Sequence, residues 1–119
     1  MNGHPSLSSQ YVPKFLHQIG GHNDDALSLR HCVTTCRIFK PLQNNGRGQH
    51  EVSFYLQLEK SLLPIDLFLL SILPTFYGTT EIFILEKEIT CLALQDVTNG
   101  IKRPHIMDIK MGTKTVRIN

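Results

Sequence analysis

The order of hydrophobic and polar residues along the chain predicts three strands. β-branched residues and rough alternation over residues 32–40 are typical of a strand, which Pro41 ends. A run rich in Ile and Phe predicts a second strand at 81–85, and a nearly apolar run predicts a third at 89–97. The charged residues 86–88 between these two runs indicate a hairpin turn. The apolar character of the third run favours a central place in a sheet.

Two segments between the first and second strands have helical character. From Glu51 the apolar residues recur at helix-like spacing, and this helix is expected to stop near Leu63 and Pro64. A second apolar segment over 65–73 predicts a short helix that Pro74 breaks. Composition predicts loops or turns at residues 44–48, 76–78 and 98–100. A small antiparallel sheet with one or two helices packed on it is an α+β fold.

Composition and charge narrow the class of protein. The 119 residues suffice for one modest domain, and a hydrophobic content of 41% allows a core to form. The net charge of +2 gives no argument for a nucleic-acid partner. No run of about 18 apolar residues occurs, and residues 1–10 lack the apolar stretch of a secretory signal. Three cysteines provide no disulfide framework, so we expect a reducing compartment, the nucleus and cytoplasm.

The cysteines and histidines raise the alternative of a zinc site. Cys32 and Cys36 have a spacing inside the loose range for zinc ligands. His31 and His50 supply no second pair with a clean spacing, and Cys91 stands alone in the sequence. We therefore interpret the cysteines as structural and expect no metal site within this chain.

Residues 104–112 combine charged and apolar side chains in a short space. Asp108 and Lys110 stand two residues apart among Ile106, Met107 and Ile109. If the segment is extended, the carboxylate and the ammonium lie on one face. Such a pair suits a polyol and a polyphosphate, because the carboxylate accepts hydrogen bonds from hydroxyls and the ammonium neutralises phosphate. The alternative is an amphipathic strand with a surface ion pair worth about 0–1 kcal/mol.

The spacing Pro-x-x-x-Asp-x-Lys-x-Gly in this segment is also the signature of the inositol polyphosphate kinase family. Four upstream blocks resemble the same family in the same order. The five blocks are 17–22, 39–55, 73–78, 94–97 and 104–112. The resemblance is closest to the multikinase branch, with the hexakisphosphate kinases as the alternative. It implies that residues 15–115 form a kinase-like N-terminal lobe, with a flexible leader at 1–14 and a divergent tail at 116–119.

The resemblance assigns an ATP-binding role to several of these residues. Lys40 matches the strand lysine that binds ATP phosphates, and Glu51 matches the helix residue that pairs with this lysine. The backbone carbonyl of Gln95 and the N–H of Val97 match the hinge that holds the adenine edge, although the family usually has Glu at the first of these positions. Asp108 matches the residue that accepts hydrogen bonds from the ribose hydroxyls. Without the resemblance, Lys40 would be interpreted as a solvated lysine at the end of a strand.

Three residues match positions near the phosphoryl acceptor. Gln43 and Arg47 match multikinase residues near the inositol phosphates, where an arginine in a glycine-flanked loop can present its guanidinium to a phosphate. Lys110 matches the catalytic lysine that contacts the transferring phosphate and the substrate, where it stabilises charge in the transition state. Without the resemblance, Arg47 would be interpreted as a solvated loop residue.

The resemblance also implies a reaction and its cofactors. A member of this family transfers the γ-phosphoryl group of ATP, with Mg²⁺, to a hydroxyl of an inositol polyphosphate. A phosphoinositide headgroup is an open alternative substrate, and the sequence does not specify the hydroxyl. The metal ligands belong to a C-terminal lobe that these 119 residues do not include, so we expect a truncated form that is inactive alone. The alternative is a non-catalytic short isoform that acts as an interaction or regulatory module.

Overall fold

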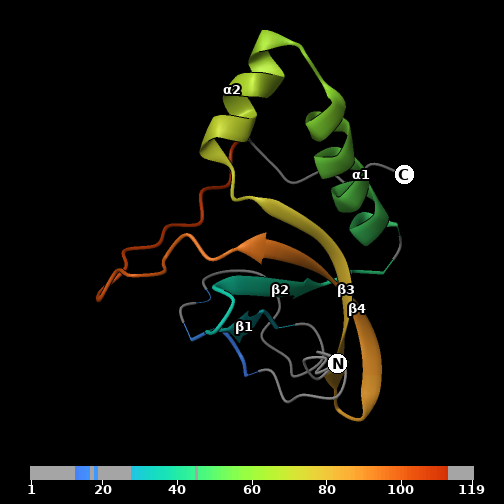
Figure 1. Cartoon of the computed structure of the whole chain (residues 1–119), viewed down its shortest axis with the longest axis vertical. Coiled ribbons are helices and arrows are strands. Elements are labelled where there is room, and N and C mark those ends of the chain that lie inside the picture. The colour runs from blue at the N-terminus through green and yellow to red at the C-terminus, as the bar shows by residue number, and fades with distance from the viewer. Residues whose placement is uncertain (1–12, 17, 19–27, 45, 113–119) are drawn as a thin grey trace, which may run out of the picture.

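The computed structural model describes residues 13–16, 18, 28–44 and 46–112. Within these residues, a four-stranded antiparallel sheet lies below two helices, as Figure 1 shows. The elements are β1 (Arg30–Cys32), β2 (Arg37–Pro41), α1 (Arg47–Lys60), α2 (Pro64–Ile72), β3 (Phe76–Ile84) and β4 (Lys87–Gln95). The strand order in the sheet is β1-β2-β4-β3. The predicted α+β class is therefore confirmed, and the arrangement is consistent with a kinase-like N-terminal lobe.

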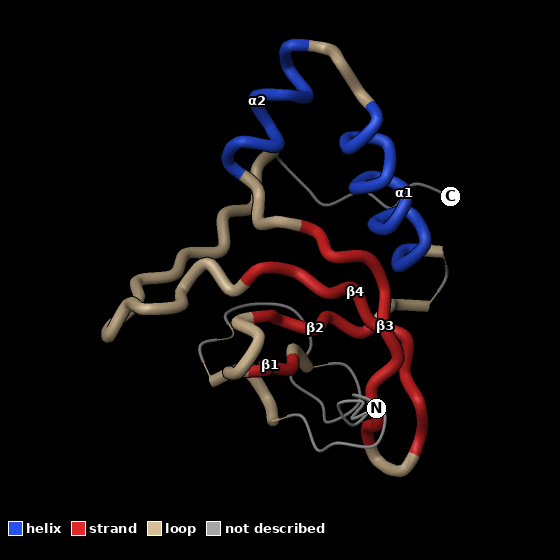
Figure 2. Tube along the Cα trace, viewed as in Figure 1, coloured by secondary structure: helices blue, strands red, loops and turns tan. Residues whose placement is uncertain are grey.

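Strand β4 is one of the two inner strands of the sheet (Figure 2), as its apolar sequence predicted. It pairs with β2 on one side and with β3 on the other, which explains why its residues 91–94 are all apolar. The core contains buried residues from all three strands. They are Phe39, Ile82, Ile84, Cys91 and Ala93. The strand begins at Lys87 and ends at Gln95, two residues earlier at each end than predicted.

The two helices differ in how much of their surface is buried. α1 buries Tyr55 and Leu58, and the Tyr55 ring stacks on Phe76 of β3 with 4.9 Å between centroids. α2 begins with Pro64, whose fixed φ suits the first helical turn, and it buries none of its residues. The predicted short helix is therefore confirmed. Among the described residues, no helix is long and apolar enough to span a membrane.

The strand predicted at 32–40 is confirmed at residues 37–40 and wrong at residues 33–36, where the chain turns. β1 ends at Cys32, residues 33–36 form a turn, and β2 starts at Arg37. Cys36 has a positive φ of 56°, and its N–H donates to the Val33 carbonyl. Positive φ is uncommon for residues other than glycine, and this segment is rich in β-branched residues. Its composition therefore predicted a strand and gave no indication of the hairpin turn.

Helix α1 begins at Arg47, four residues before the predicted start, so only the first part of the expected loop at 44–48 is a loop. Gly46 precedes the helix with a left-handed φ of 79°. Gly48 lies in the first turn, where a Cβ atom would approach the Leu42 Cβ to 2.7 Å. This glycine permits close packing within a helix, whereas composition suggested a loop.

The turn predicted at 76–78 is instead an irregular part of β3. The register against β4 shifts between Phe76 and Thr79, and Gly78 has a φ of 94°. The β3–β4 hairpin reverses at Leu85 and Glu86, both with positive φ, slightly before the predicted position at 86–88. The loop predicted at 98–100 is a turn, as expected.

Some sequence predictions fall on residues that the structure does not describe. These include most of the leader, most of the block at 17–22 and the tail at 116–119. Within the leader, Lys14 is described and forms an isolated β-bridge with Arg30. Residues 104–112 are described, but they belong to none of the strands, so the strand considered for them does not form.

Candidate functional site

Lys40 and Glu51 form an ion pair between the sheet and α1. The Lys40 Nζ atom lies 2.9 Å from the Glu51 Oε2 atom, and each side chain is about one third exposed. Lys40 pairs with Leu92 in the β2–β4 ladder, while its neighbour Phe39 is fully buried in the core. Alternation along β2 thus directs Phe39 inward and leaves the Lys40 ammonium to meet the helix. The contact expected from the resemblance is present, and the role of both residues toward ATP stays a prediction.

A tight connection between β2 and α1 positions this pair. The Leu42 N–H donates to the Thr90 carbonyl at 3.0 Å, and the Gly48 N–H donates to the Gln43 carbonyl at 3.2 Å. Gln43 is half-buried in this connection. Arg47 is exposed and occupies the first turn of α1 rather than a loop, four residues before Glu51 and on the same helix face. Both candidate substrate residues therefore lie close to the Lys40–Glu51 pair along the chain.

Gln95 ends β4 and is tied to Thr75 by both its backbone and its side chain. The Gln95 N–H donates to the Thr75 carbonyl at 2.9 Å. Its Oε1 atom accepts hydrogen bonds from the Thr75 N–H at 3.1 Å and from the Thr75 hydroxyl at 3.2 Å. A glutamate carboxylate could accept the same two hydrogen bonds. The replacement of the family's usual Glu by Gln therefore keeps this local arrangement.

Residues 96–99 form a turn whose backbone N–H groups differ in their partners among the described residues. The Asp96 N–H donates to the Cys36 carbonyl, and the Asn99 N–H donates to the Asp96 carbonyl. The Thr98 N–H donates to the Asp96 carboxylate. Among the described residues, no acceptor is hydrogen-bonded to the N–H of Val97, and this residue is 62% exposed. A backbone N–H in an exposed residue, with no acceptor among the described residues, can donate to the acceptor of a planar base.

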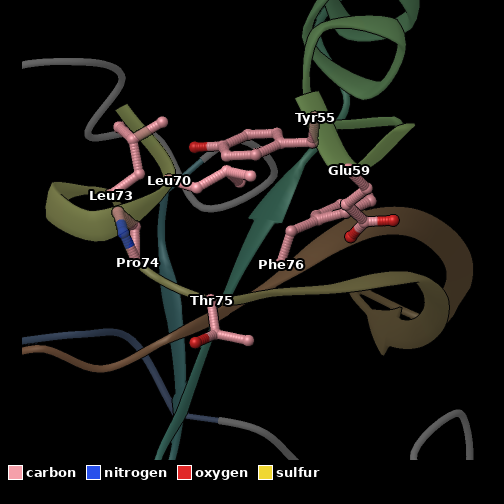
Figure 3. Close-up of a pocket in the computed structure, with 7 residues that line it drawn as sticks. All are labelled: Tyr55, Glu59, Leu70, Leu73, Pro74, Thr75 and Phe76. Atoms are coloured by element: carbon pink, nitrogen blue, oxygen red, sulfur yellow. The ribbon is translucent and has the colours of Figure 1, made fainter. Parts of the chain in front are cut away.

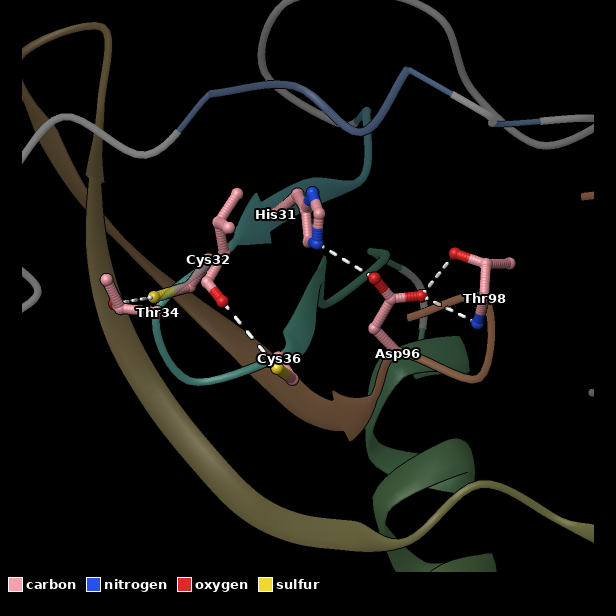
Figure 4. A network of polar contacts seen from close by, with 7 residues as sticks. His31, Cys32, Thr34, Cys36, Asp96 and Thr98 are labelled. Atoms are coloured by element: carbon pink, nitrogen blue, oxygen red, sulfur yellow. Dashed lines mark hydrogen bonds and ion pairs between the residues drawn. The ribbon is translucent and has the colours of Figure 1, made fainter. Parts of the chain in front are cut away.

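Sequence reasoning missed Asp96, which lies between the two predicted hinge residues. Its side chain is almost completely buried and contacts His31 of β1 and Thr98 (Figure 4). The Asp-x-Thr pattern was available as a signal, because a short acidic side chain commonly accepts a hydrogen bond from the backbone two residues later. The contact with His31 had no such signal, since the two residues are far apart in the sequence.

Asp108 and Lys110 are also paired, but in an exposed segment. The Lys110 Nζ atom lies 2.9 Å from the Asp108 Oδ2 atom, with the two side chains 73% and 35% exposed. The two side chains lie on one side of the segment even though it is not a strand. Within the part of the chain that the structure describes, no hydrogen bond or ion pair joins this pair to Lys40 or Glu51.

A small pocket lies between the two helices and the start of β3, as Figure 3 shows. Its volume is about 210 Å³, below the ~300–1,000 Å³ of typical small-molecule sites. The stacked rings of Tyr55 and Phe76 face it, and Glu59 supplies a carboxylate. Burial raises the pKa of Tyr55, and the negative charge of Glu51 raises it further. The pocket is too small for a nucleotide, so it does not compete with the predicted ATP-binding residues.

The described residues contain no group of three or more His, Cys, Asp or Glu side chains that could hold a metal ion. The zinc alternative, which included Cys32 and Cys36, therefore gains no support from the geometry. None of the described residues is proposed as a ligand of Mg²⁺.

Comparisons with known proteins place these features in a family. The family model for inositol polyphosphate kinase matches residues 91–119. Inositol polyphosphate multikinase beta from Arabidopsis thaliana is 32% identical over 102 residues, which cover 83% of this chain and 34% of that protein. Inositol polyphosphate multikinase from Mus musculus is 33% identical over 117 residues, covering 93% of this chain and 28% of that protein.

The chain thus spans about a third or less of the length of these curated relatives. No solved structure shows significant similarity to it. The family model and the curated relatives agree on one family. The chain therefore belongs to the inositol polyphosphate kinase family.

Proposed function

We propose that this chain forms the nucleotide-binding wall of an ATP-dependent inositol polyphosphate kinase. The observation that carries the proposal is the 2.9 Å contact between Lys40 and Glu51. A glutamate on a helix holds the lysine ammonium at a fixed place above the sheet, where it can neutralise the phosphates of a nucleotide. The N–H of Val97, an exposed residue, supplies the second element of a nucleotide site, a donor for the base.

The other charged residues take roles toward the ribose and the acceptor in this proposal. Asp108 accepts hydrogen bonds from the ribose hydroxyls, and Lys110 stabilises the transferring phosphoryl group. Gln43 and Arg47 contact the phosphates of the inositol ring. The acceptor is an inositol polyphosphate or a phosphoinositide headgroup, and the reaction requires Mg²⁺. We place this activity in the nucleus and cytoplasm.

Nucleotide binding provides the direct test. The dissociation constant of a non-hydrolysable ATP analogue should rise at least tenfold in Lys40→Ala, because a charge-assisted contact with phosphate is lost. Lys87→Ala is the matched control, since Lys87 is exposed at the start of β4. Isothermal titration calorimetry measures both. Equal affinity in wild type and Lys40→Ala would remove this lysine from the phosphate site.

Turnover distinguishes the kinase from the non-catalytic alternative. We expect these 119 residues alone to give no product from ATP, Mg²⁺ and inositol trisphosphate, because the resemblance places the metal ligands in a C-terminal lobe and phosphoryl transfer needs them. In an active longer protein that carries this sequence, Lys110→Ala should abolish transfer while ATP still binds. Retention of near-parental kcat in Lys110→Ala would contradict the catalytic role. Partner binding without any nucleotide affinity would favour an interaction module.

A further inference from the structure

The turn that follows β4 is organised around one buried carboxylate. Asp96 is only 4% exposed, and burial of a carboxylate costs free energy unless partners compensate for the lost water. Its Oδ2 atom lies 2.8 Å from the His31 Nε2 atom. Its Oδ1 atom accepts hydrogen bonds from the Thr98 N–H at 2.9 Å and from the Thr98 hydroxyl at 2.5 Å. Both carboxylate oxygens are therefore satisfied, as Figure 4 shows.

The backbone of Asp96 is fixed as firmly as its side chain. Its N–H donates to the Cys36 carbonyl at 2.9 Å, and its carbonyl accepts from the Asn99 N–H at 3.2 Å. The orientation of the peptide groups on either side of Asp96 follows from these contacts. Those peptide groups contain the Gln95 carbonyl and the Val97 N–H, which are the two groups expected to hold adenine.

His31 is itself held in place from outside the turn. It lies on β1, its backbone N–H donates to the Pro13 carbonyl at 2.8 Å, and the Phe15 ring contacts its imidazole edge-on with centroids 5.4 Å apart. An Nε2–H group donates to a carboxylate in the neutral tautomer that carries this proton and in the imidazolium form. The β1–β2 hairpin thus reaches the nucleotide-binding turn at two points, His31 and Cys36.

We propose that His31 is a positioning residue for base recognition, which it controls by holding Asp96 in the turn that presents Gln95 and Val97. The inference rests on the proposed nucleotide site and adds a residue outside its predicted contacts. A correctly placed carbonyl and N–H accept from the exocyclic amine of adenine and donate to its N1 atom. Hypoxanthine, with a carbonyl and an N1–H at these positions, presents the opposite pattern. Loss of the His31 contact should therefore weaken discrimination between the two bases.

Two substitutions of His31 that differ in reach test this inference. The amide nitrogen of Gln extends to about the place of Nε2, whereas that of Asn is nearer to the place of Nδ1. The measured quantity is the ratio of dissociation constants for the non-hydrolysable analogues of inosine triphosphate and ATP. We expect His31→Asn to lower this ratio about tenfold, because a hydrogen bond to a charged group is lost, and His31→Gln to retain most of it.

Controls separate this inference from the proposed function. Lys40→Ala should weaken both analogues equally, because it removes a contact with phosphate and none with the base. Thr34→Ala changes the same hairpin but not the contact with Asp96, and it should leave the ratio unchanged. A wild-type chain that binds neither analogue overturns the proposed function. A folded His31→Asn variant with the wild-type ratio of dissociation constants overturns the role of His31 alone. A lower ratio in His31→Asn that is restored in His31→Gln supports this role.

Discussion

Two ion pairs of the same length, 2.9 Å, lie in different surroundings in this molecule. Lys40 and Glu51 come from a strand and a helix, and both are about two thirds buried. Lys110 and Asp108 come from neighbouring positions in an exposed segment, and the Lys110 side chain is 73% exposed. The first pair is brought together by the packing of α1 on the sheet. The second pair forms between side chains only two positions apart in the sequence, so it needs no packing between separate elements.

The comparison shows that a short distance does not measure how well a group is positioned. The Lys40–Glu51 contact depends on the buried strand beneath it and on the close approach at Gly48. The Asp108–Lys110 contact has no comparable support among the described residues, and exposed pairs of this kind contribute little to stability. A rigid ammonium suits the binding of a phosphate, whereas a loosely held pair can separate and bind two different partners.

The largest effect should come from removal of the core beneath the first pair. Phe39 is completely buried next to Lys40, so Phe39→Ala should lower the free energy of unfolding by about 3–5 kcal/mol. Met111→Ala is the matched control beside the second pair, because Met111 is 90% exposed and its loss should change stability by less than about 0.5 kcal/mol. Urea denaturation followed by circular dichroism measures both values.

Similar losses in both variants would show that the exposed segment is as well packed as the sheet. If Phe39→Ala is already unfolded in water, Ile82→Val provides a milder change in the same core, with an expected cost of about 0.5–1.5 kcal/mol. A loss near zero in Ile82→Val would contradict the packed support for Lys40.

An intermediate effect is expected from alkaline pH, through Cys91 in the strand beside Lys40. Burial raises the pKa of this thiol from 9.0 to about 12, with a further rise from the Glu81 charge that Arg30 partly opposes. The unfolded chain releases this proton first, so stability is intact below about pH 9 and falls as pH rises toward 12. The total loss is on the order of a few kcal/mol. Denaturant midpoints measured at several pH values between 9 and 12 report this loss of stability.

Cys91→Ala should remove most of this dependence between pH 9 and 10, where the thiol contributes more than Tyr55, whose ordinary pKa is 10.0. Burial also acts to raise the pKa of Cys32, but hydrogen bonds from Thr34 and Thr35 outweigh it and lower the pKa overall. Cys32→Ala should therefore leave the alkaline loss in place. An unchanged alkaline loss in Cys91→Ala would show that water reaches the strand beside Lys40.

The sequence predicted those parts of the fold that depend on runs of one residue type. Strand β4 and helix α2 follow from continuous apolar segments, so both were placed within two residues. The β1–β2 hairpin and the start of α1 depend instead on single backbone conformations. Cys36 adopts a positive φ without being glycine, and Gly48 serves close packing inside a helix. Composition does not indicate either feature.

The candidate site was predictable in a similar way. The contact between Lys40 and Glu51 followed from resemblance to a family, since residue types alone left both as ordinary surface groups. The contact between His31 and Asp96 joins the edge strand β1 to the residue that follows the inner strand β4. Nothing local to either residue indicates the other, because the sheet order that brings them together is a property of the whole fold.

The smallest effect, and the sharpest test of the comparison, is the coupling energy within each ion pair. A double-mutant cycle of Lys40→Ala and Glu51→Ala should give about 1 kcal/mol, because the pair is partly shielded from water and held by packing. The same cycle for Asp108→Ala and Lys110→Ala should give about 0–0.5 kcal/mol and should vanish first as salt is added, since exposed charges are well screened. Chemical denaturation at low and high ionic strength measures both cycles. Equal coupling in the two cycles would mean that the sheet and α1 add nothing to the contact between Lys40 and Glu51, and the case for a pre-positioned phosphate-binding lysine would then fail.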